Sequence, residues 1–304
     1  VIDVNDRSLR NIIVGLGSKE DGVTRQTGFD ITAASEVMAI LALATSIEDM
    51  RARFGRIVVG YNTKGVPVTA EQLSGAGSMA VIMREAIKPN LLQTLENTPV
   101  IVHAGPFGNI AHGNSSIIGD MIGIHCGDYL ITEAGFGADM GAERFFNIKC
   151  RTSGLVPDAA VLVTTVRALK AHSGKHKIVA GKALPAELLA ENPSDVEAGG
   201  ANLKKQIENV KAHGVTPVVA INAFPTDHKS EHDVIRRIAA EAGARVAVCT
   251  HFADGGAGAV DLAKAVEEAC QEKNDFHLLY PSEASLKEKI ETVATKIYGA
   301  AKVE

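Results

Sequence analysis

The segment TPVVAINAFPTDHKSEHDVIRRIAAEAGARVAVCTHF, residues 216–252, decides the fold class. Two short runs rich in Val, Ala and Ile, at 216–224 and 244–252, flank a run at 230–243 whose apolar residues recur at helical spacing. Buried strands separated by a helix are typical of a parallel sheet with helices on its faces. Ligands bind beyond the carboxyl ends of such strands, where both of these runs end in a Phe.

The same alternation extends over most of the chain. Further strands are expected at residues 56–61, 99–105, 128–135 and 158–166, and further helices at residues 30–54, 74–97, 202–214 and 260–273. The stretch at 173–202 has Pro, Gly and mixed charges with little periodicity, and we interpret it as a surface insertion between two sheets. The sequence therefore predicts an α/β protein of mostly parallel sheets, divided into residues 1–172 and 173–304.

Composition narrows the class of protein. The chain has 304 residues and a net charge of -5, which argues against binding to nucleic acid or a membrane surface, because such binding needs a basic surplus. No apolar run approaches the roughly 18 to 20 residues of a membrane span. The spacing of the 4 cysteines matches no disulfide or zinc framework, which indicates a reduced, intracellular, cytoplasmic chain.

The sequence HKSEH, His228 to His232, matches the H-x-x-E-H pattern of some zinc proteases. The two imidazoles would share a helix face if a helix had begun before them. Ser230 and Asp233, however, indicate a helix start, which places His228 ahead of the helix. We therefore interpret the motif as a capped first turn and assign no metal ligand. A metal hydrolase using both His residues stays as the alternative.

Two loops are candidates for binding an anion or a polar substrate. In EAGFGADMGAERF, residues 133–145, the glycines would let backbone N–H groups close on a phosphate at a helix N-terminus. Their spacing differs from the dinucleotide fingerprint, so a tight structural turn is an equal alternative. In HAGPFGNIAHGNSS, residues 103–116, the side chains able to hydrogen-bond a substrate are Asn109, His112, Asn114 and Ser115. A purely structural role for His112 is its alternative.

Phe224 and Phe252 follow consecutive strands of the expected sheet. Two aromatic rings near one sheet edge would sandwich a flat heterocycle. The competing interpretation places both rings in the core. The core is the default interpretation from the residues alone, and the neighbours of the two rings, which are Asn, Pro, Asp and Gly instead of Val and Leu, weaken it.

Several motifs together resemble one family. VTTVRALKAHSG, residues 163–174, is similar to the second signature of formate–tetrahydrofolate ligases, whose usual form is close to V-A-T-V-R-A-L-K-x-H-G-G. TGFDITAASEVMAI (27–40), EAGFGADMGAERFFNIKCR (133–151) and INAFPTDH (221–228) also resemble that family. The similarity extends over essentially the whole chain.

This resemblance implies a P-loop NTPase-like architecture and a ligation reaction. Formate, ATP and tetrahydrofolate would give 10-formyltetrahydrofolate, ADP and phosphate, because a carboxylate becomes a good acyl donor only after ATP converts it to formyl phosphate. Positive groups and backbone N–H donors would hold the transferring phosphoryl oxygens. The resemblance also implies Mg²⁺ with ATP, a monovalent cation such as K⁺ or NH₄⁺, and a homotetramer. The remaining partners would be small molecules, with no nucleic acid and no membrane.

Individual roles also follow from the resemblance. Phe224 would lie against the folate pterin, and Phe252 stands where the family usually has Trp. The adenine or folate cavity would also include Asn222, Ala253, Gly255 and Gly256. The loop facing phosphate and formyl phosphate would carry the catalytic set Gly137, Asp139 and Gly141, with binding contributions from Gly135, Phe136, Asn109 and Ser115.

The resemblance also shapes the expectation for the chain as a whole. The family's P-loop and a further small domain have no counterpart in this sequence, which opens at Val1 without Met, so we expect the central portion of such a ligase. Residues 1–172 would be part of the large nucleotide-binding domain, and residues 173–304 a second α/β domain with the folate-stacking loops. Alone this portion is expected to be inactive. A catalytically dead scaffold or oligomerisation module of the same fold is the alternative.

Overall fold

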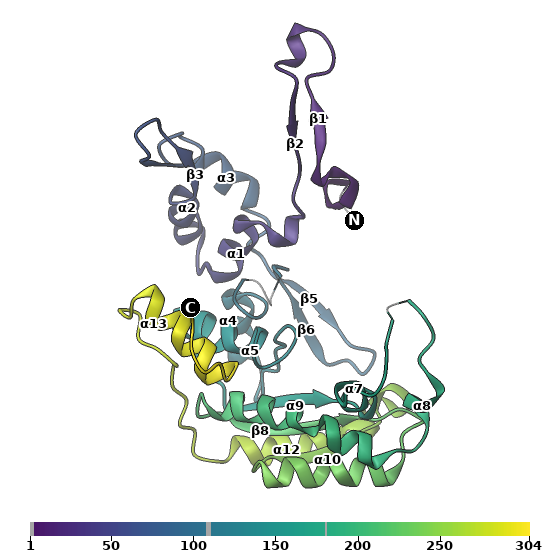
Figure 1. Cartoon of the computed structure of the whole chain (residues 1–304). Helices are drawn as coiled ribbons and strands as arrows, with labels where there is room; N and C mark the ends of the chain where they lie inside the picture. Colours follow the sequence, from purple (N-terminus) through teal and green to yellow (C-terminus); the bar gives the residue numbers. More distant parts are fainter. Residues whose placement is uncertain (1–2, 108–110, 180) are drawn as a thin grey trace. The chain divides into compact units, whose positions relative to one another are not determined.

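The structure, a computed structural model, describes residues 3–107, 111–179 and 181–304. It divides into two compact units (Figure 1): unit 1 ends at Phe136, and unit 2 runs from Gly137 to Glu304. Each unit has its own apolar core and is described by itself.

Unit 1 combines short helices with antiparallel hairpins. Its described strands pair as β1 (Ile12–Val14) with β2 (Arg25–Thr27), β3 (Val58–Tyr61) with β4 (Pro67–Thr69), and β5 (Asn90–Gln93) with β6 (Pro99–Val102). Its α-helices are α1 (Glu36–Leu43), α2 (Ile47–Gly55), α3 (Ala76–Met83) and α4 (Ile117–Cys126). Short 3₁₀ helices lie at Asp3–Asn5, Arg7–Arg10, Lys19–Asp21 and Thr32–Ala34.

The core of unit 1 forms where α1, α2 and α3 meet. Leu41, Met50, Phe54, Ala76 and Ala80 are buried there in one cluster. The apolar spacing of residues 30–54 predicted one long helix, but Ser46 begins a second one, since its Oγ accepts a hydrogen bond from the N–H of Asp49 at 3.1 Å. The break lets α2 turn back so that its apolar side chains reach those of α1.

The expected parallel arrangement is wrong for unit 1. Strands form within residues 56–61 and 99–105 as predicted, but each pairs with its neighbour in a hairpin, and no strand forms at residues 128–135. Local turn chemistry explains the hairpins. Asn62 Oδ1 accepts the N–H groups of Lys64 and Val66, and Gly65 supplies a φ of 74°. A turn this strongly determined brings the next segment back as the pairing partner.

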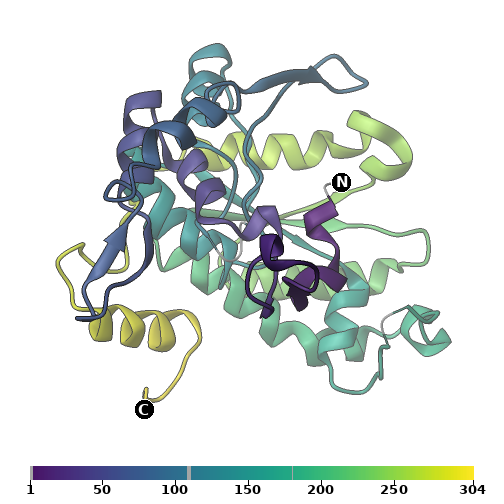
Figure 2. The same ribbon diagram turned by 90° about the horizontal axis from the view of Figure 1, so that it is seen from above.

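Unit 2 contains a parallel sheet with helices packed around it. Figure 2 shows the same ribbon from above. Its described strands are β7 (Ala159–Thr164), β8 (Thr216–Asn222) and β9 (Arg245–Cys249). Its α-helices are α5 (Gly141–Arg144), α6 (Arg151–Ser153), α7 (Val166–His172), α8 (Ala186–Leu189), α9 (Pro193–Lys211), α10 (Lys229–Glu241), α11 (His251–Asp254), α12 (Val260–Cys270) and α13 (Leu286–Thr292). Two π-helical segments (Phe145–Cys150 and Val293–Ile297) and a 3₁₀ helix (Gly255–Ala259) complete it. In the described parts of the chain, no helix combines the length and apolar character needed to cross a bilayer.

The strand order in this sheet is β7-β8-β9, and both pairings are parallel. Side chains alternate between the two faces of each strand. Val219 and Ile221 of β8 join α7, α9 and α10 in the main buried cluster, whereas Val218 and Ala220 face the other side, and α12 contacts the same strands. The prediction of an α/β fold with a parallel sheet flanked by helices is therefore confirmed in unit 2, and the arrangement is consistent with a P-loop NTPase-like architecture.

The predicted division at residue 172 falls inside unit 2, because β7 pairs with β8 in a single sheet. The stretch at 173–202, predicted to be a surface insertion, is only partly so, since α9 begins at Pro193 and buries Val196. Gly199 and Gly200 of this stretch lie in α9 and serve helix packing instead of a loop. A Cβ at Gly199 would lie 1.8 Å from the carbonyl oxygen of Leu169, so only glycine lets α9 approach α7 this closely. The assignment of nucleotide and folate roles to the two ranges stays a prediction.

Candidate functional site

The carboxyl ends of β8 and β9 place two predicted binding loops next to each other. Asn222, the last residue of β8, is the register partner of Cys249, the last residue of β9. The N–H of Ala223 donates to the carbonyl oxygen of Cys249 at 3.0 Å and extends the pairing by one residue. The loops that carry Phe224 and Phe252 therefore leave the same edge of the sheet. This is the edge at which parallel α/β proteins bind ligands.

The loop after β8 is fixed by its own hydrogen bonds. The N–H of Phe224 donates to Asp227 Oδ2 at 3.0 Å, and the N–H of Asp227 donates to the carbonyl oxygen of Phe224 at 2.9 Å. The Asp227 side chain is only 2% exposed, and His232 Nε2 lies 3.4 Å from its Oδ2. Asp227 therefore closes a tight turn in which both the N–H and the carbonyl group of Phe224 are hydrogen-bonded.

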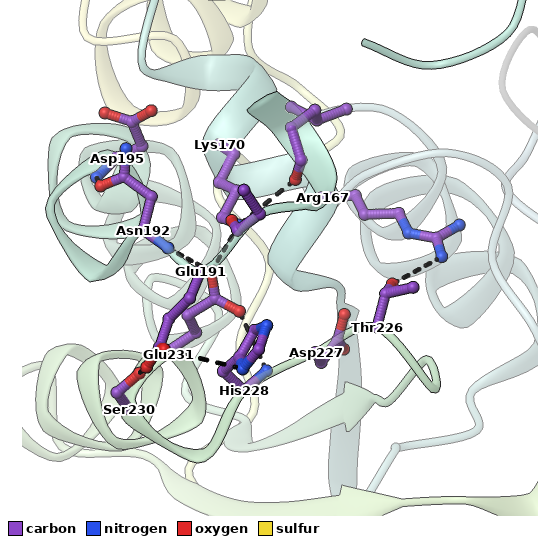
Figure 3. Close-up of polar contacts among 12 residues, drawn as sticks. Arg167, Lys170, Glu191, Asn192, Asp195, Thr226, Asp227, His228, Ser230 and Glu231 are labelled. Atoms are coloured by element: carbon purple, nitrogen blue, oxygen red, sulfur yellow. Dashed lines mark hydrogen bonds and ion pairs between the residues drawn. The ribbon is translucent and has the colours of Figure 1, made fainter. Parts of the chain in front are cut away.

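Helix α7 holds the same loop from the side (Figure 3). The guanidinium carbon of Arg167 lies 3.9 Å from the centroid of the Phe224 ring, well within the range of a cation–π contact. One guanidinium N–H also donates to Thr226 Oγ1 at 3.0 Å. One face of the Phe224 ring is therefore covered by Arg167.

One turn further along α7, Lys170 is a buried cation that is only 1% exposed. Its ammonium group forms an ion pair with Glu231 and donates to the carbonyl oxygens of Leu188, at 3.2 Å, and Ala190, at 2.6 Å. All three donors of the ammonium group therefore have partners, which is the condition under which a buried charge is tolerated.

Glu231 is the fully buried acceptor at the centre of this network. Its Oε2 accepts the N–H of His228 at 3.0 Å, and its Oε1 accepts the N–H of Asn192 at 2.9 Å. Burial raises the pKa of Glu231, but the hydrogen bonds from Lys170, Asn192 and His228 outweigh it and leave the pKa below its usual value. Glu231, near the start of α10, therefore connects Lys170 of α7, the segment before α9 and the end of the Phe224 loop.

The H-x-x-E-H match is explained by this arrangement. His228 is the residue before α10, so the prediction that it precedes the helix is confirmed. The predicted start at Ser230 is one residue late, because the capping carboxylate is Glu231, while Asp233 pairs with Lys229 at 2.6 Å. Across the described ranges, no cluster of three or more His, Cys, Asp or Glu residues is arranged to hold a metal ion.

The loop after β9 presents Phe252 to solvent. The ring is 95% exposed, so the alternative that it belongs to the core is wrong. The loop closes through a hydrogen bond from the N–H of Thr250 to the carbonyl oxygen of Gly258 at 2.9 Å. A Cβ at Gly258 would lie 2.6 Å from the carbonyl carbon of Thr250, so glycine is required where the loop folds back on itself.

The other predicted cavity residues belong to these two loops. Asn222 ends β8, Ala253 lies in α11 directly after Phe252, and Gly255 and Gly256 begin the 3₁₀ helix that follows, so residues 252–256 form an exposed helical turn. Gly255 has a φ of 58° and a ψ of -145°, a conformation that side chains strongly disfavour. The structure thus places Asn222, Phe224 and the 252–256 turn at one sheet edge, and their binding of a nucleotide or folate stays a prediction.

The predicted catalytic loop lies at the start of unit 2 and is held by α9. Gln206 accepts the N–H of Ala138 at 2.8 Å through its Oε1 and donates to Asp139 Oδ1 at 3.1 Å through its Nε2. The carbonyl oxygen of Asp139 accepts the Tyr298 hydroxyl at 3.0 Å. A Cβ at Gly137 would lie 2.5 Å from Asp139 Oδ1, so a larger residue there would displace the Asp139 side chain from Gln206. Helix α5 then begins at Gly141, as predicted, but no strand precedes the loop.

The remaining predicted binding residues belong to unit 1. The Oγ of Ser115 donates to the carbonyl oxygen of His103, and Phe136 is 79% exposed with a φ of 63°. The N–H of Gly135 donates to the carbonyl oxygen of Gly113 at 2.9 Å. Asn109 lies outside the described residues.

Two other polar residues of the 103–116 loop are buried in unit 1. His112 is only 1% exposed, and Asn114 donates from Nδ2 to Thr132 Oγ1 at 2.9 Å. This burial fits a structural role for both side chains better than direct contact with a substrate.

The residues that sequence reasoning missed are Arg167, Lys170 and Glu231. A signal for the first two was present, because both are charged and lie three residues apart in a helix whose Val166 and Leu169 are buried. Charged residues alternating with core residues in a short helix indicate that the charges face other parts of the protein. The partner Glu231 could not be identified, since it is 61 residues away from Lys170 in the sequence (231 minus 170).

A parallel sheet flanked by helices, with aromatic and glycine-rich loops at its carboxyl edge, defines an α/β protein with a candidate ligand site. Comparison with known sequences identifies the family of the chain. The chain belongs to the formate–tetrahydrofolate ligase family, whose sequence model matches residues 1–304.

Several bacterial relatives carry the same name. The chain is 71% identical over 300 residues to formate–tetrahydrofolate ligase of Saccharopolyspora erythraea, covering 99% of this chain and 53% of the relative. It is 68% identical over 313 residues to formate–tetrahydrofolate ligase 3 of Rubrobacter xylanophilus, covering 100% and 55%. With the enzyme of Cutibacterium acnes, the identity is 66% over 300 residues, covering 99% and 53%. The chain thus spans about half the length of the curated relatives it matches.

Proposed function

We propose that the whole protein joins formate to tetrahydrofolate in an ATP-dependent reaction that yields 10-formyltetrahydrofolate, ADP and phosphate through formyl phosphate. Family membership supports the reaction class. The single observation that supports a folate site in this chain is the Phe224 ring, which is held at the carboxyl end of β8 beside an exposed, glycine-rich loop. A flat pterin ring and a fixed aromatic ring at a sheet edge suit each other chemically.

Within this proposal, the two strand-end loops have different tasks. The Phe224 ring and the exposed Phe252 would bind the pterin from opposite sides, with Phe252 replacing the larger Trp of the family. Asn222, whose amide carries both donors and an acceptor, would read the polar edge of the pterin or adenine. The 253–256 turn has little side-chain bulk and would let the ligand approach the backbone.

The loop at Gly137, Asp139 and Gly141 would face the activated formyl group. The loop is held in place by Gln206, which hydrogen-bonds both the N–H of Ala138 and the carboxylate of Asp139. Phosphoryl transfer depends on positioning and on compensating developing charge, so a loop held rigidly by a long helix suits that task. The Asp139 carboxylate carries a negative charge and would act by orienting N–H donors, not by binding phosphate directly.

ATP is expected to bind with Mg²⁺, and a monovalent cation such as K⁺ or NH₄⁺ is expected to support the reaction. Magnesium bound to nucleotide phosphates needs only one or two protein carboxylates. The described residues offer no cluster of three or more metal-binding side chains. We therefore assign no ligand to either cation and derive no step from them.

Assembly and location are also part of the proposal. A homotetramer in the cytoplasm is expected from the family resemblance. Within the described ranges, Cys126, Cys150, Cys249 and Cys270 form no disulfide bond, which suits a reducing compartment.

The proposal is tested on the whole protein with ATP, formate, Mg²⁺, K⁺ and tetrahydrofolate. Formation of 10-formyltetrahydrofolate is expected, and Phe224→Ala should weaken tetrahydrofolate binding by about 5- to 150-fold, as loss of one stacked face costs roughly 1 to 3 kcal/mol. Absence of both turnover and tetrahydrofolate binding would instead support a scaffold that keeps only the fold. Unchanged binding in Phe224→Ala would remove Phe224 from the site.

A further inference from the structure

We infer that Arg167 is a positioning residue of the folate site: it fixes the Phe224 ring and leaves only the opposite ring face open to a flat ligand. This inference rests on the proposed function, because it takes Phe224 as the ring on which the ligand stacks. It adds a second layer to the site, in which a guanidinium, an aromatic ring and a flat ligand are stacked in that order.

Two contacts carry the inference. The guanidinium carbon lies 3.9 Å from the ring centroid of Phe224, which is the separation of two groups in direct face contact. The same guanidinium donates to Thr226 Oγ1 at 3.0 Å, two residues further along the loop. A planar group held at both points cannot slide away from the ring without breaking a hydrogen bond. The covered ring face is therefore closed to any other planar group.

The Arg167 guanidinium contacts an aromatic ring and a hydroxyl group. Among the described residues, no carboxylate forms an ion pair with Arg167, and its buried Nε atom has no hydrogen-bond partner. Arg237 shows the ordinary alternative, because it forms ion pairs with Glu197 and Glu241 on the exposed surface of α10. Arg167 instead places its guanidinium on an aromatic face, where the contact with Phe224 is its main interaction.

The backbone beneath this stack is fixed as well. Arg167 and Lys170 lie three residues apart in α7, so they project from the same side of the helix. Lys170 pairs with Glu231, whose carboxylate accepts the N–H of His228 at the end of the Phe224 loop. Helix α7 therefore holds the ring through Arg167 and the end of the loop through Lys170. A ring fixed before the ligand arrives loses less freedom on binding.

The inference predicts a specific kinetic pattern in the whole protein. Arg167→Ala should raise the dissociation constant and KM for tetrahydrofolate by about 2- to 30-fold, the range of a cation–π contact, with kcat and the KM values for ATP and formate little changed. Arg167→Lys should show a smaller loss, since it keeps the charge but not the planar group. Arg237→Ala is the matched control, an arginine engaged only in surface ion pairs, and should bind tetrahydrofolate normally.

A double-mutant cycle separates this inference from the proposed function. Tetrahydrofolate binding is measured by titration calorimetry for Arg167→Ala, Phe224→Ala and the double variant, with thermal melts to check folding. If Arg167 acts through Phe224, the double variant should bind no more weakly than Phe224→Ala alone. Fully additive losses, or normal binding by Arg167→Ala when Phe224→Ala binds weakly, would overturn the inference. Normal binding by Phe224→Ala would remove Phe224 from the site and overturn this inference with it, whereas absence of both turnover and tetrahydrofolate binding in the whole protein would overturn the proposed function.

Folding defects do not remove the test. If Arg167→Ala melts well below the parent, the measurement passes to Arg167→Lys, which keeps a long side chain packed along α7. A purely structural arginine would then lower the melting temperature and the affinities for all three substrates together. A selective loss of tetrahydrofolate affinity is the result that supports positioning.

Discussion

Unit 1 and unit 2 use similar β-branched segments in opposite ways. Val58 and Tyr61 of β3 lie in a hairpin closed by the Asn62 turn, and both are exposed. Val219 and Ile221 of β8 have comparable side chains but are fully buried between two other strands and their helices. A short apolar run therefore specifies a strand, while the residues that follow it decide the partner: a turn signal gives a hairpin, and a helix gives a parallel crossover.

The difference extends to how each unit is held together. Unit 1 depends on helix contacts such as Phe54 with its neighbours and on local turns. Unit 2 adds a buried ion pair between residues far apart in the sequence, Lys170 and Glu231. The stability of unit 2 should therefore fall when one residue of a pair far apart in the sequence is changed. The stability of unit 1 should depend mainly on contacts and turns between residues close in the sequence.

The largest effect is expected from breaking that pair. Lys170→Met in the whole protein leaves the Glu231 carboxylate buried without its cation, which should cost unit 2 about 3 to 5 kcal/mol of unfolding free energy. Hydrogen exchange followed by mass spectrometry should show faster exchange in α7 and α10, while α1 and α2 of unit 1 keep their protection. Lys170→Met combined with Glu231→Gln should recover part of the loss, because the neutral amide removes the unpaired charge while its oxygen still accepts one of the two N–H groups that Glu231 binds. Equal loss of protection in both units would contradict the comparison.

A smaller effect is expected from acid. Burial lowers the pKa of His213 to about 4 from the ordinary 6.5, because the charged imidazolium is poorly solvated there. The unfolded chain binds the His213 proton more tightly than the folded chain does. The contribution of neutral His213 to the unfolding free energy is therefore fully present above pH 6.5 and is lost as the pH falls toward 4. Over that window the loss should reach about 2 to 3 kcal/mol. Urea unfolding of unit 2 at a series of pH values measures it, and His213→Asn should flatten the dependence.

Adding a methyl group between α7 and α9 should have a further, moderate effect. Gly199→Ala places a Cβ against the carbonyl oxygen of Leu169, so the helices must separate, at a cost of about 1 to 3 kcal/mol. The measurement is the urea midpoint of unit 2. A midpoint equal to that of the parent would show that α7 and α9 adjust without strain.

The smallest effect has the opposite sign and belongs to unit 1. Gly77 lies in α3, and a Cβ there meets nothing within 4 Å. Gly77→Ala should therefore stabilise unit 1 by about 0.5 to 1 kcal/mol, because alanine loses less backbone freedom in a helix. Denaturation monitored by exchange in α3 is the measurement. Together with Gly199→Ala, it tests whether close helix packing distinguishes unit 2 from unit 1.

Much of unit 2 could be predicted from the sequence. The strands at 158–166, 216–224 and 244–252 and the helices between the last two have strong, uninterrupted patterns, and the structure contains them all within a few residues. The polar neighbours of Phe252 count against a core position, and its 95% exposure agrees with them. Pattern alone was sufficient wherever a segment is buried by the elements next to it in sequence.

The rest could not be predicted, for physical reasons. Whether residues 56–61 pair locally or at a distance depends on the Asn62 turn, which competes with a parallel arrangement that looks identical in hydrophobic pattern. The sequence around Gly199 and Gly200 predicts a loop, because only the neighbouring helices reveal that both glycines are points of helix contact. The Arg167 stack and the Glu231 pair depend on residues that meet only after the sheet has formed.

The two cations of α7 have a consequence for how this chain tolerates insertions and deletions. Arg167 and Lys170 each meet a different partner, and both contacts depend on the angular position of one short helix. Removing or adding a single residue between Thr165 and Arg167 would turn the rest of α7 by about 100° and carry both cations away from their partners at once. This helix should therefore not vary in length even where single substitutions are accepted. The buried ion pair of Lys170 and the position of the Phe224 ring both depend on the rotation of α7 about its axis.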